Sequence, residues 1–235
     1  MGLRNPFADL SRSERILWGV SVCAIIGSYA LSGGGDVLTL IASLIGVTAL
    51  IFVAKGYVIG QVLTVVFAVF YGVISFFFRY YGEMITYLGM TAPSAIATVI
   101  SWLRHPYAGT REVEVHRLTR RQIAVMIVAS GAVTAIFYFI LSALGNANLL
   151  FSTVSVTTSF VASYLTFYRS PYYALGYAAN DVVLIILWVM ATLEDISYLP
   201  MIVCFVMFLL NDLYGFFNWR RMQRRQGENL CEKTH

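Results

Sequence analysis

The sequence predicts an all-helical membrane protein with about eight transmembrane helices. Of its 235 residues, 59% are hydrophobic and 12% are charged, and the mean hydropathy is +0.74. An ordinary soluble domain carries about 25% charged residues. Long apolar runs alternate with short polar connections, and these connections hold most of the basic side chains. Very little chain is left over for a soluble domain.

A spanning helix needs roughly 20 consecutive, mostly apolar residues. Eight runs approach that length, and we predict a span in each: 16–31, 37–54, 58–78, 84–103, 123–144, 149–167, 172–193 and 199–218.

The basic residues predict the orientation, because short cytoplasmic loops retain Lys and Arg. With both termini in the cytoplasm, all 16 Lys and Arg except Arg79 fall on the cytoplasmic side. They are Arg4, Arg12, Arg15, Lys55, Arg104, Arg111, Arg117, Arg120, Arg121, Arg169, Arg220, Arg221, Arg224, Arg225 and Lys233. The outer connections hold Asp36, Glu83, Glu194 and Asp195. The net charge of +4 is therefore explained by topology and by contact with anionic membrane lipid. Nucleic acid is not an expected partner.

The chain also repeats itself. Residues 57–60 (Tyr-Val-Ile-Gly) open the third span, and residues 173–176 (Tyr-Ala-Leu-Gly) open the seventh. Residues 102–104 (Trp-Leu-Arg) close the fourth span and residues 219–221 (Trp-Arg-Arg) close the eighth, at nearly the same offset. Two triplets joined by a single crossing helix would have the same orientation, as in transporters with parallel repeats.

This repeat predicts how the chain is divided. The expected parts are an N-terminal segment with an extra helix (1–35), a first three-helix repeat (36–104), a cytoplasmic loop with a linker helix (105–147), a second three-helix repeat (148–220) and a cytoplasmic tail (221–235).

Two carboxylates at membrane depth are the first candidates for a site. Asp181 follows Asn180, and Asp212 follows Asn211, within runs otherwise apolar enough to span. An intramembrane carboxylate is costly, so it usually faces a water-filled pathway or a polar partner. The alternative is that these side chains only join helices to one another. We expect Asn180 and Asp181 to face the pathway, whereas for Asp212, which Arg220 and Arg221 follow, we favour the role of joining helices.

Further polar and aromatic residues belong to the same prediction. Gln61 occupies the position that the repeat pairs with Tyr177, close to Asn180. Tyr71 and Trp188 lie away from the water interfaces, where aromatic belts normally sit. Trp188 follows Asp181 by two helical turns, which suits a flat, polar and possibly cationic ligand. The predicted substrate-binding residues are Gln61, Tyr71, Asn180, Asp181, Trp188 and Asn211.

Hydroxyl side chains form stripes along two predicted spans, because steps of three and four keep one helix face aligned. The stripes are Tyr87, Thr91, Ser94, Thr98 and Ser101 in the fourth span, and Ser152, Ser155, Ser159, Ser163 and Thr166 in the sixth. Small hydroxyl residues also let membrane helices approach closely. The stripes therefore indicate either packing seams or the lining of a pathway.

Enzyme chemistry is the weakest interpretation. The three histidines, His105, His116 and His235, fall on predicted cytoplasmic segments, and no zinc-protease, nucleophile-elbow or phosphate-loop motif is present in the sequence. We expect no catalytic residue, no metal and no cofactor. A transporter is the leading hypothesis, and a non-transporting receptor or scaffold is second.

Three segments resemble the PnuC family of nicotinamide riboside transporters. They are residues 80–84 (Tyr-Tyr-Gly-Glu-Met), residues 176–181 (Gly-Tyr-Ala-Ala-Asn-Asp) together with Trp188, and residues 208–219 (Phe-Leu-Leu-Asn-Asp-Leu-Tyr-Gly-Phe-Phe-Asn-Trp). The resemblance covers nearly the whole chain. It implies a three-plus-one-plus-three core related to the SWEET sugar transporters, a homotrimer in the bacterial inner membrane, and facilitated uptake without a coupling ion. Phosphorylation of the vitamin inside the cell would trap it there.

The resemblance allows more than one substrate. Val189 and Met190 follow Trp188, whereas family members that carry nicotinamide riboside tend to have more tryptophan there. Similar transporters carry thiamine, riboflavin or deoxynucleosides. No basic residue is expected at mid-membrane depth, so an unphosphorylated compound is favoured over nicotinamide mononucleotide.

Overall fold

The computed structural model describes residues 5–32, 37–77, 81–146 and 148–232. Of the charged residues used to predict the orientation, Arg4, Asp36, Arg79 and Lys233 lie outside the described residues, as does Tyr80 of the PnuC-like segment.

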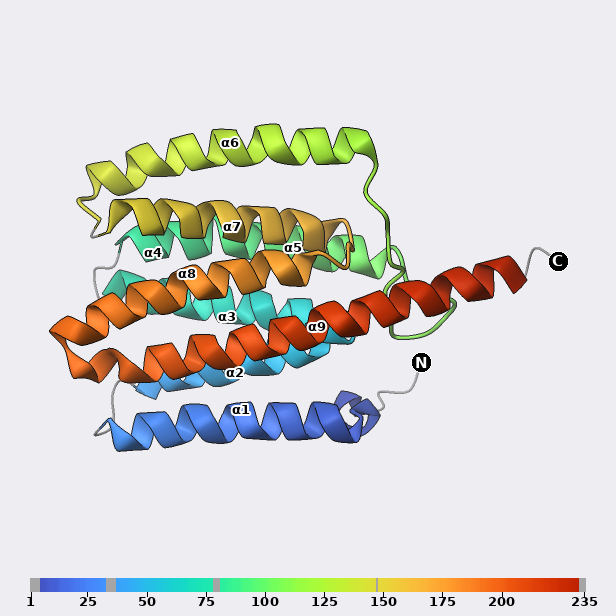
Figure 1. Ribbon diagram of the computed structural model, residues 1–235, viewed down its shortest axis with the longest axis horizontal. Coiled ribbons are helices and arrows are strands. Elements are labelled where there is room, and N and C mark those ends of the chain that lie inside the picture. The colour runs from blue at the N-terminus through green and yellow to red at the C-terminus, as the bar shows by residue number, and fades with distance from the viewer. Residues whose placement is uncertain (1–4, 33–36, 78–80, 147, 233–235) are drawn as a thin grey trace.

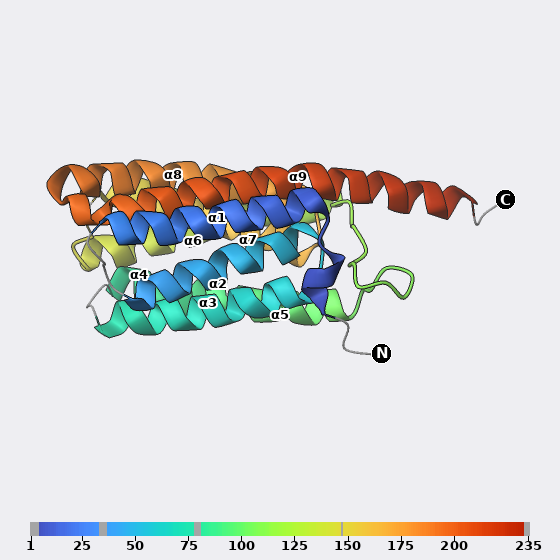
Figure 2. The same cartoon turned by 90° about the horizontal axis from the view of Figure 1, so that it is seen from below.

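The described chain forms one bundle of roughly aligned helices (Figures 1 and 2). The helices are α1 (Arg12–Leu31), α2 (Val37–Ala54), α3 (Val58–Phe77), α4 (Tyr81–Thr86), α5 (Ala92–Leu103), α6 (Arg120–Ala143), α7 (Leu149–Phe167), α8 (Tyr173–Glu194) and α9 (Leu199–Glu232). A π-helical turn, η2 (Tyr87–Thr91), joins α4 to α5, and two 3₁₀ turns, η1 (Pro6–Asp9) and η3 (Ile196–Tyr198), precede α1 and α9. With α4, η2 and α5 as one span, these elements match the eight predicted runs.

By length and composition, seven helical segments of the described chain can cross a membrane. In α3, the stretch Val58–Val73 is apolar but shorter. The predicted fold class, an all-helical membrane protein, is confirmed.

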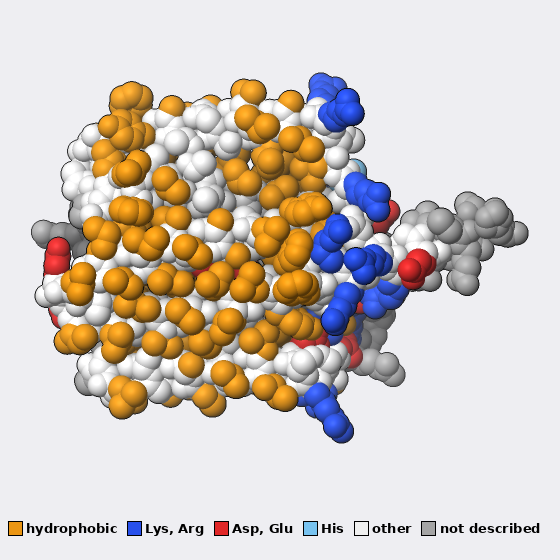
Figure 3. All heavy atoms as spheres, in the orientation of Figure 1, with side chains coloured by type: hydrophobic (Ala, Val, Ile, Leu, Met, Phe, Trp, Pro, Cys, Tyr) orange, Lys and Arg blue, Asp and Glu red, His pale blue; other side chains and the backbone are white. Residues whose placement is uncertain are grey.

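Basic side chains collect at one end of the bundle, which we call the basic end (Figure 3). Lys55, Arg104 and Arg169 follow helices that finish there, and Arg12 and Arg120 begin helices that start there. Both chain termini lie toward the same end (Figure 1). The side of the membrane that this end faces stays a prediction.

Local signals fix where the helices begin and end. Ser11 and Glu14 form a capping box at the start of α1, and Thr119 and Gln122 form another at the start of α6. Each box satisfies backbone N–H groups that the first helical turn leaves without partners. Gly56, with a φ of +68°, ends α2, because a residue without Cβ adopts this left-handed conformation without strain.

The helix contacts are arranged as two equivalent triplets. In the first, α3 packs against α2 and α5, and in the second, α8 packs against α7 and α9. The triplets meet through α2 with α9 and through α5 with α7. The linker helix α6 packs on α7, and the extra helix α1 packs on α2 and α9. This is the predicted three-plus-one-plus-three arrangement with an added N-terminal helix.

The repeated glycines explain the close packing inside each triplet. A Cβ on Gly60 would lie 2.4 Å from the backbone nitrogen of Val53 in α2. A Cβ on Gly176 would lie 2.9 Å from Cα of Ala162 in α7. Both glycines stand in the first turn of the middle helix of their triplet, so both helix pairs need a residue without a side chain there.

At the basic end, the first triplet is tied to the second by two hydrogen bonds from the end of α5. The hydroxyl of Ser101 donates to the carbonyl of Phe167 at 2.9 Å, and the indole N–H of Trp102 donates to the carbonyl of Thr166 at 2.9 Å. These carbonyls belong to the last residues of α7, which lack partners within their own helix.

Two equivalent hydrogen bonds run from α9 of the second triplet to the end of α2 in the first. The amide of Asn218 donates to the carbonyl of Ala54 at 2.8 Å, and the indole N–H of Trp219 donates to the carbonyl of Val53 at 2.9 Å. We call these four hydrogen bonds the clasp. In each triplet, the third helix caps the first helix of the other triplet, as two related repeats would require.

Candidate functional site

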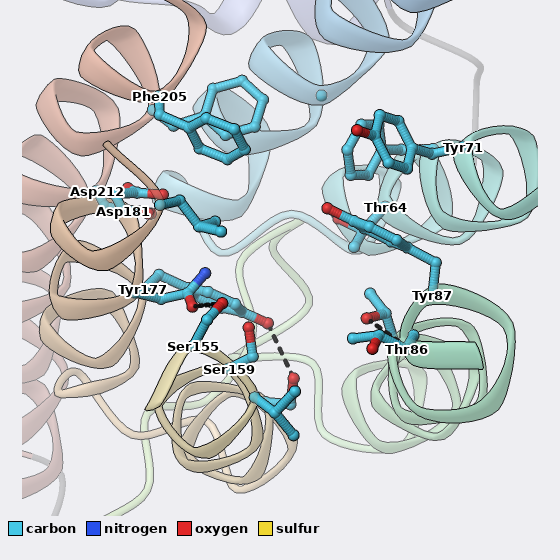
Figure 4. Close-up of a pocket in the computed structure, with 18 of the residues that line it drawn as sticks. Thr64, Tyr71, Thr86, Tyr87, Ser155, Ser159, Tyr177, Asp181, Phe205 and Asp212 are labelled. Atoms are coloured by element: carbon cyan, nitrogen blue, oxygen red, sulfur yellow. Dashed lines mark hydrogen bonds between the residues drawn. The ribbon is translucent and has the colours of Figure 1, made fainter. Parts of the chain in front are cut away.

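A cavity of about 220 Å³ lies between the two triplets (Figure 4). The polar side chains that line it are Gln61, Thr64, Tyr71, Thr86, Tyr87, Thr91, Asn146, Ser152, Ser155, Ser159, Ser163, Tyr177, Asn180, Asp181, Trp188 and Asp212. The cavity extends from Asn146, which follows α6 at the end opposite the basic end, to Gln61 and Tyr177 near the basic end. Its position between repeats is the one expected for a transport substrate.

Five of the six predicted site residues line this cavity: Gln61, Tyr71, Asn180, Asp181 and Trp188. Asn211 is not brought to it. Its amide nitrogen donates to the hydroxyl of Ser21 in α1 at 3.0 Å and to the carbonyl of Met207 at 2.7 Å. Consecutive helical residues point about 100° apart, and on α9 it is Asp212 that faces the cavity, so Asn211 faces α1.

Asn180 is held by hydroxyl groups of the neighbouring helix. Its Oδ1 accepts hydrogen bonds from Ser155 at 2.9 Å and from Thr158 at 3.1 Å, both in α7. With its oxygen occupied in this way, the amide nitrogen is left to donate toward the cavity. The result is a hydrogen-bond donor of fixed orientation in the wall.

The hydroxyl stripes serve both of the roles that the sequence left open. Four members of the α7 stripe line the cavity, and one of them, Ser155, also joins α7 to α8 through its hydrogen bond to Asn180. Of the other stripe, Tyr87 and Thr91 line the cavity, whereas Ser101 donates in the clasp. Each stripe therefore lines part of the cavity and also joins its helix to a neighbouring one.

Two carboxyl groups lie next to each other on the wall formed by α8 and α9. Asp181 and Asp212 are 4% and 3% exposed, and both line the cavity (Figure 4). In the described part of the chain, Oδ2 of Asp181 has no hydrogen-bond partner. Among the described residues that line the cavity there is no Lys, Arg or His. The wall therefore offers carboxyl groups and no permanent positive charge.

Aromatic rings form the opposite wall. The ring centroids of Tyr71 and Tyr87 are 4.6 Å apart, and Phe67 lies 5.8 Å from each (Figure 4). Phe208 of α9 joins this cluster, with its ring centroid 6.4 Å from that of Phe67 and 5.6 Å from that of Phe205. These rings could accommodate a planar ligand by stacking.

The sequence reasoning missed Phe67, Phe205 and Phe208, although a signal was present. Phe67 precedes the predicted residue Tyr71 by four positions and follows Thr64 by three, and steps of three and four keep one face of α3 toward the cavity. Phe208 and Phe205 precede Asp212 by steps of four and three on α9. Following the face of each candidate polar residue would have found all three rings.

The π-helical turn is a further feature of this wall that was not predicted. Thr86, Tyr87 and Thr91 all line the cavity, and the Thr91 hydroxyl donates to the carbonyl of Thr86 at 3.3 Å. Pro93 follows the turn, and because it has no N–H it cannot bond to the carbonyl of Gly89 one turn earlier. Single π turns are frequent at functional sites, and here the turn widens the helix beside the cavity.

Comparison with known proteins agrees with this architecture. The family model described as "Nicotinamide mononucleotide transporter" matches residues 36–221. A relative from Neisseria mucosa, named nicotinamide riboside transporter PnuC, is 30% identical over 194 residues, which cover 80% of this chain and 73% of the relative. A relative of the same name from Haemophilus influenzae is 23% identical over 226 residues, covering 95% and 96% of the two chains.

A solved structure is also similar. The chain superposes on a structure described as the crystal structure of the vitamin B3 transporter PnuC with a TM-score of 0.80 and 25% sequence identity, covering 94% of this chain and 95% of the other. The family match begins at α2, so it includes both triplets and leaves α1 outside. The chain therefore belongs to the PnuC family of membrane transporters.

Proposed function

We propose that this protein transports nicotinamide riboside, the unphosphorylated precursor, through the cavity by facilitated diffusion. The observation that carries the proposal is the charge of the wall, which has two carboxyl groups and no basic side chain among its described residues. Recognition of a phosphate calls for Arg, Lys or clustered backbone donors. A mononucleotide would bring negative charge next to Asp181 and Asp212, whereas the pyridinium ring of the riboside brings a positive charge.

The shape and polarity of the wall support the same ligand. Planar aromatic rings and Trp188 suit a flat nicotinamide ring, and the fixed donor of Asn180 suits a carbonyl oxygen. The hydroxyl groups of Ser155, Ser159 and Ser163 along α7 suit a ribose. The relatives from Neisseria mucosa and Haemophilus influenzae are both named as riboside transporters.

The setting is also part of this proposal. We place the protein in the bacterial inner membrane with the basic end in the cytoplasm, as the positive-inside rule favours. The homotrimer implied by the family resemblance is supported by α6, where Ile127, Val128 and Phe139 are between 62% and 74% exposed in the single chain. Such an apolar face suits lipid or a neighbouring copy.

The test is uptake by proteoliposomes that contain the purified protein. Nicotinamide riboside should enter saturably and without a pH or sodium gradient, and nicotinamide mononucleotide should not compete. Thiamine, riboflavin and thymidine, added one at a time, test the alternative cargoes. Saturable mononucleotide uptake at similar affinity would contradict the charge argument. Absence of flux for the whole panel, with binding retained, would favour a receptor.

A further inference from the structure

We propose that the clasp and the two indole rings inside it form the gate that closes the pathway at the basic end, and that cargo leaves only when the clasp opens. The inference rests on the proposed function for its cargo, but its test below needs no cargo.

The gate is a single layer of buried rings beneath the cavity. Trp102 and Trp219 are both 0% exposed, and their ring centroids lie 5.5 Å apart. The ring centroid of Tyr173 lies 5.0 Å from that of Trp219. This layer touches the cavity directly, because Val53 and Tyr177 line the cavity and also pack in the same hydrophobic cluster. A solute in the cavity would have to displace these rings to reach the basic end.

Each clasp hydrogen bond joins one triplet to the other, and none joins helices within a triplet. Separation of α5 from α7, and of α9 from α2, therefore breaks all four together. Contacts inside a triplet would survive such a motion, including the close packing at Gly60 and Gly176. The clasp thus lies at the place where two rigid triplets would part.

A short segment of the loop after α5 covers the ring layer from the basic end. Val113, 1% exposed, packs within the layer, and its backbone N–H donates to the carbonyl of Gly56 at 3.0 Å. Gln226 of α9 holds the other edge, donating to the carbonyl of Val113 at 3.1 Å and accepting from the N–H of Val115 at 2.8 Å. This segment is fastened to both triplets, so it must shift when they part.

Buried Arg169 fastens the same loop beside the clasp. Its guanidinium donates to the hydroxyl of Ser101 at 2.9 Å and to the carbonyl of Glu114 at 3.0 Å, and it lies 3.1 Å from Nδ1 of His105. Burial lowers the pKa of Arg169 from its ordinary value, although the nearby Glu114 opposes this. The loop and one half of the clasp therefore form a connected polar network.

Among the described residues, the ring layer closes the cavity at the basic end and has no counterpart at the opposite end. Toward the opposite end, the cavity reaches Asn146, next to the far end of α6, and Ser152, in the first turn of α7, and it also reaches Thr86, the last residue of α4. Among the described residues, the fully buried large rings are Trp102, Trp219, Tyr173 and Phe52, and the first three belong to the layer at the basic end. A structure closed at one end and hollow toward the other is what alternating access requires of one of its states.

The experiment measures how fast a cysteine at the cavity floor reacts from the basic end. Ser163→Cys is introduced after Cys23, Cys204 and Cys231 are replaced by Ala. A membrane-impermeant thiol reagent is added on the side that labels a cysteine at Thr110. In this parent, the reaction should be slow. Trp102→Phe and Trp219→Phe each remove the N–H donor and part of a buried ring, and each should raise the rate roughly two- to tenfold, because a hydrogen bond and some of the ring packing that hold the closed state are lost.

Trp18→Phe is the matched control. The indole N–H of Trp18 also donates a hydrogen bond, to the hydroxyl of Thr48 at 3.1 Å, but it joins α1 to α2 away from the cavity. This variant should leave the labelling rate unchanged. If a clasp variant does not fold, Asn218→Ala and Ser101→Ala remove the other two donors. Unchanged labelling in folded clasp variants, or an equal increase in Trp18→Phe, would overturn the gate. Failure of nicotinamide riboside uptake alone would overturn only the proposed function.

Discussion

The hydroxyl of Ser155 donates to Oδ1 of Asn180 across the interface of α7 and α8, at 2.9 Å. This contact, reinforced by Thr158 at 3.1 Å, fixes the orientation of the amide that precedes Asp181 in the cavity wall. Hydroxyl groups of α7 therefore position a side chain of α8 in the site, in addition to packing the two helices together. Its energetic importance can be measured directly.

Asn180→Ala should weaken nicotinamide riboside binding, because the side chain that donates to the ligand is removed and no charge is added. The loss of one donor is expected to cost about 1 kcal/mol, or roughly fivefold in Kd. Calorimetry on the purified protein gives this value. Ser155→Ala keeps the amide and loosens it, so its effect should be smaller. A larger effect from Ser155→Ala than from Asn180→Ala would contradict the role of Asn180 as a donor to the ligand.

Trp188→Ala should weaken binding by about tenfold, because a ring contact contributes about 0.5–1.5 kcal/mol beyond its buried area. Trp188 lines the cavity and packs 5.5 Å from Tyr198. Trp188→Phe retains a stacking surface and should recover most of the affinity. Normal affinity in a folded Trp188→Ala protein would place the nicotinamide ring elsewhere.

Asp181→Asn should reduce selectivity for a cationic ring. Nicotinamide riboside should bind more weakly to this variant, whereas reduced nicotinamide riboside, whose ring is neutral, should bind about as well as to the parent. The ratio of the two dissociation constants is the measurement, and Asp212→Asn should shift it in the same direction. An equal loss of affinity for both compounds would mean that Asp181 acts through shape or hydrogen bonding and not through charge.

The topology can be tested with cysteines at two loop positions. A cysteine at Thr110, in the loop at the basic end, should react only with reagents that enter the cytoplasm. A cysteine at Asn146, at the other end of α6, should react with impermeant reagents outside intact cells. The opposite labelling pattern would reverse the proposed orientation.

Lys55→Met should destabilise the protein more than Arg111→Met. Lys55 pairs with Glu14 at 3.0 Å, and the Glu14 side chain is only 4% exposed. The Arg111–Asp9 pair, at 2.9 Å, is 36% and 37% exposed, and such surface pairs contribute little. Leaving Glu14 buried without its cation should cost about 1–3 kcal/mol. Thermal unfolding in detergent measures both variants, and equal melting temperatures would contradict the difference.

The spans and most of the cavity wall could be predicted, because the length of an apolar run and the polar residues within it can be read from neighbouring positions of the sequence. Asp181 and Trp188, two turns apart, necessarily share a face. The rotation of each helix about its own axis is not local, since neighbouring helices decide it. For this reason the sequence could not show that Asp212 faces the cavity while Asn211 faces Ser21.

The hydrogen bonds of the clasp also depend on contacts between distant helices, which the sequence does not show. The matched positions of Trp102 and Trp219 were visible as a repeat, but a repeat does not reveal that each indole reaches the other triplet. That pairing depends on where the first helix of each triplet ends, near Val53 and Thr166. The π-helical turn had a local signal in Pro93, although a proline alone does not distinguish a kink from a π turn.

Helix α9 is longer than the bilayer requires. Its 34 residues extend about 50 Å, against a hydrocarbon core of about 30 Å, and it projects past the other helices at the basic end (Figure 1). The same uninterrupted rod carries Phe205 and Asp212 at the cavity and Gln226 at the loop segment. Gln226 lies about 20 Å beyond Asp212 along this helix, so a tilt of a few degrees around Asp212 would move Gln226 by about 1–2 Å. A ligand that tilts α9 at the cavity would therefore also move the loop segment at Val113, because one continuous helix contacts both.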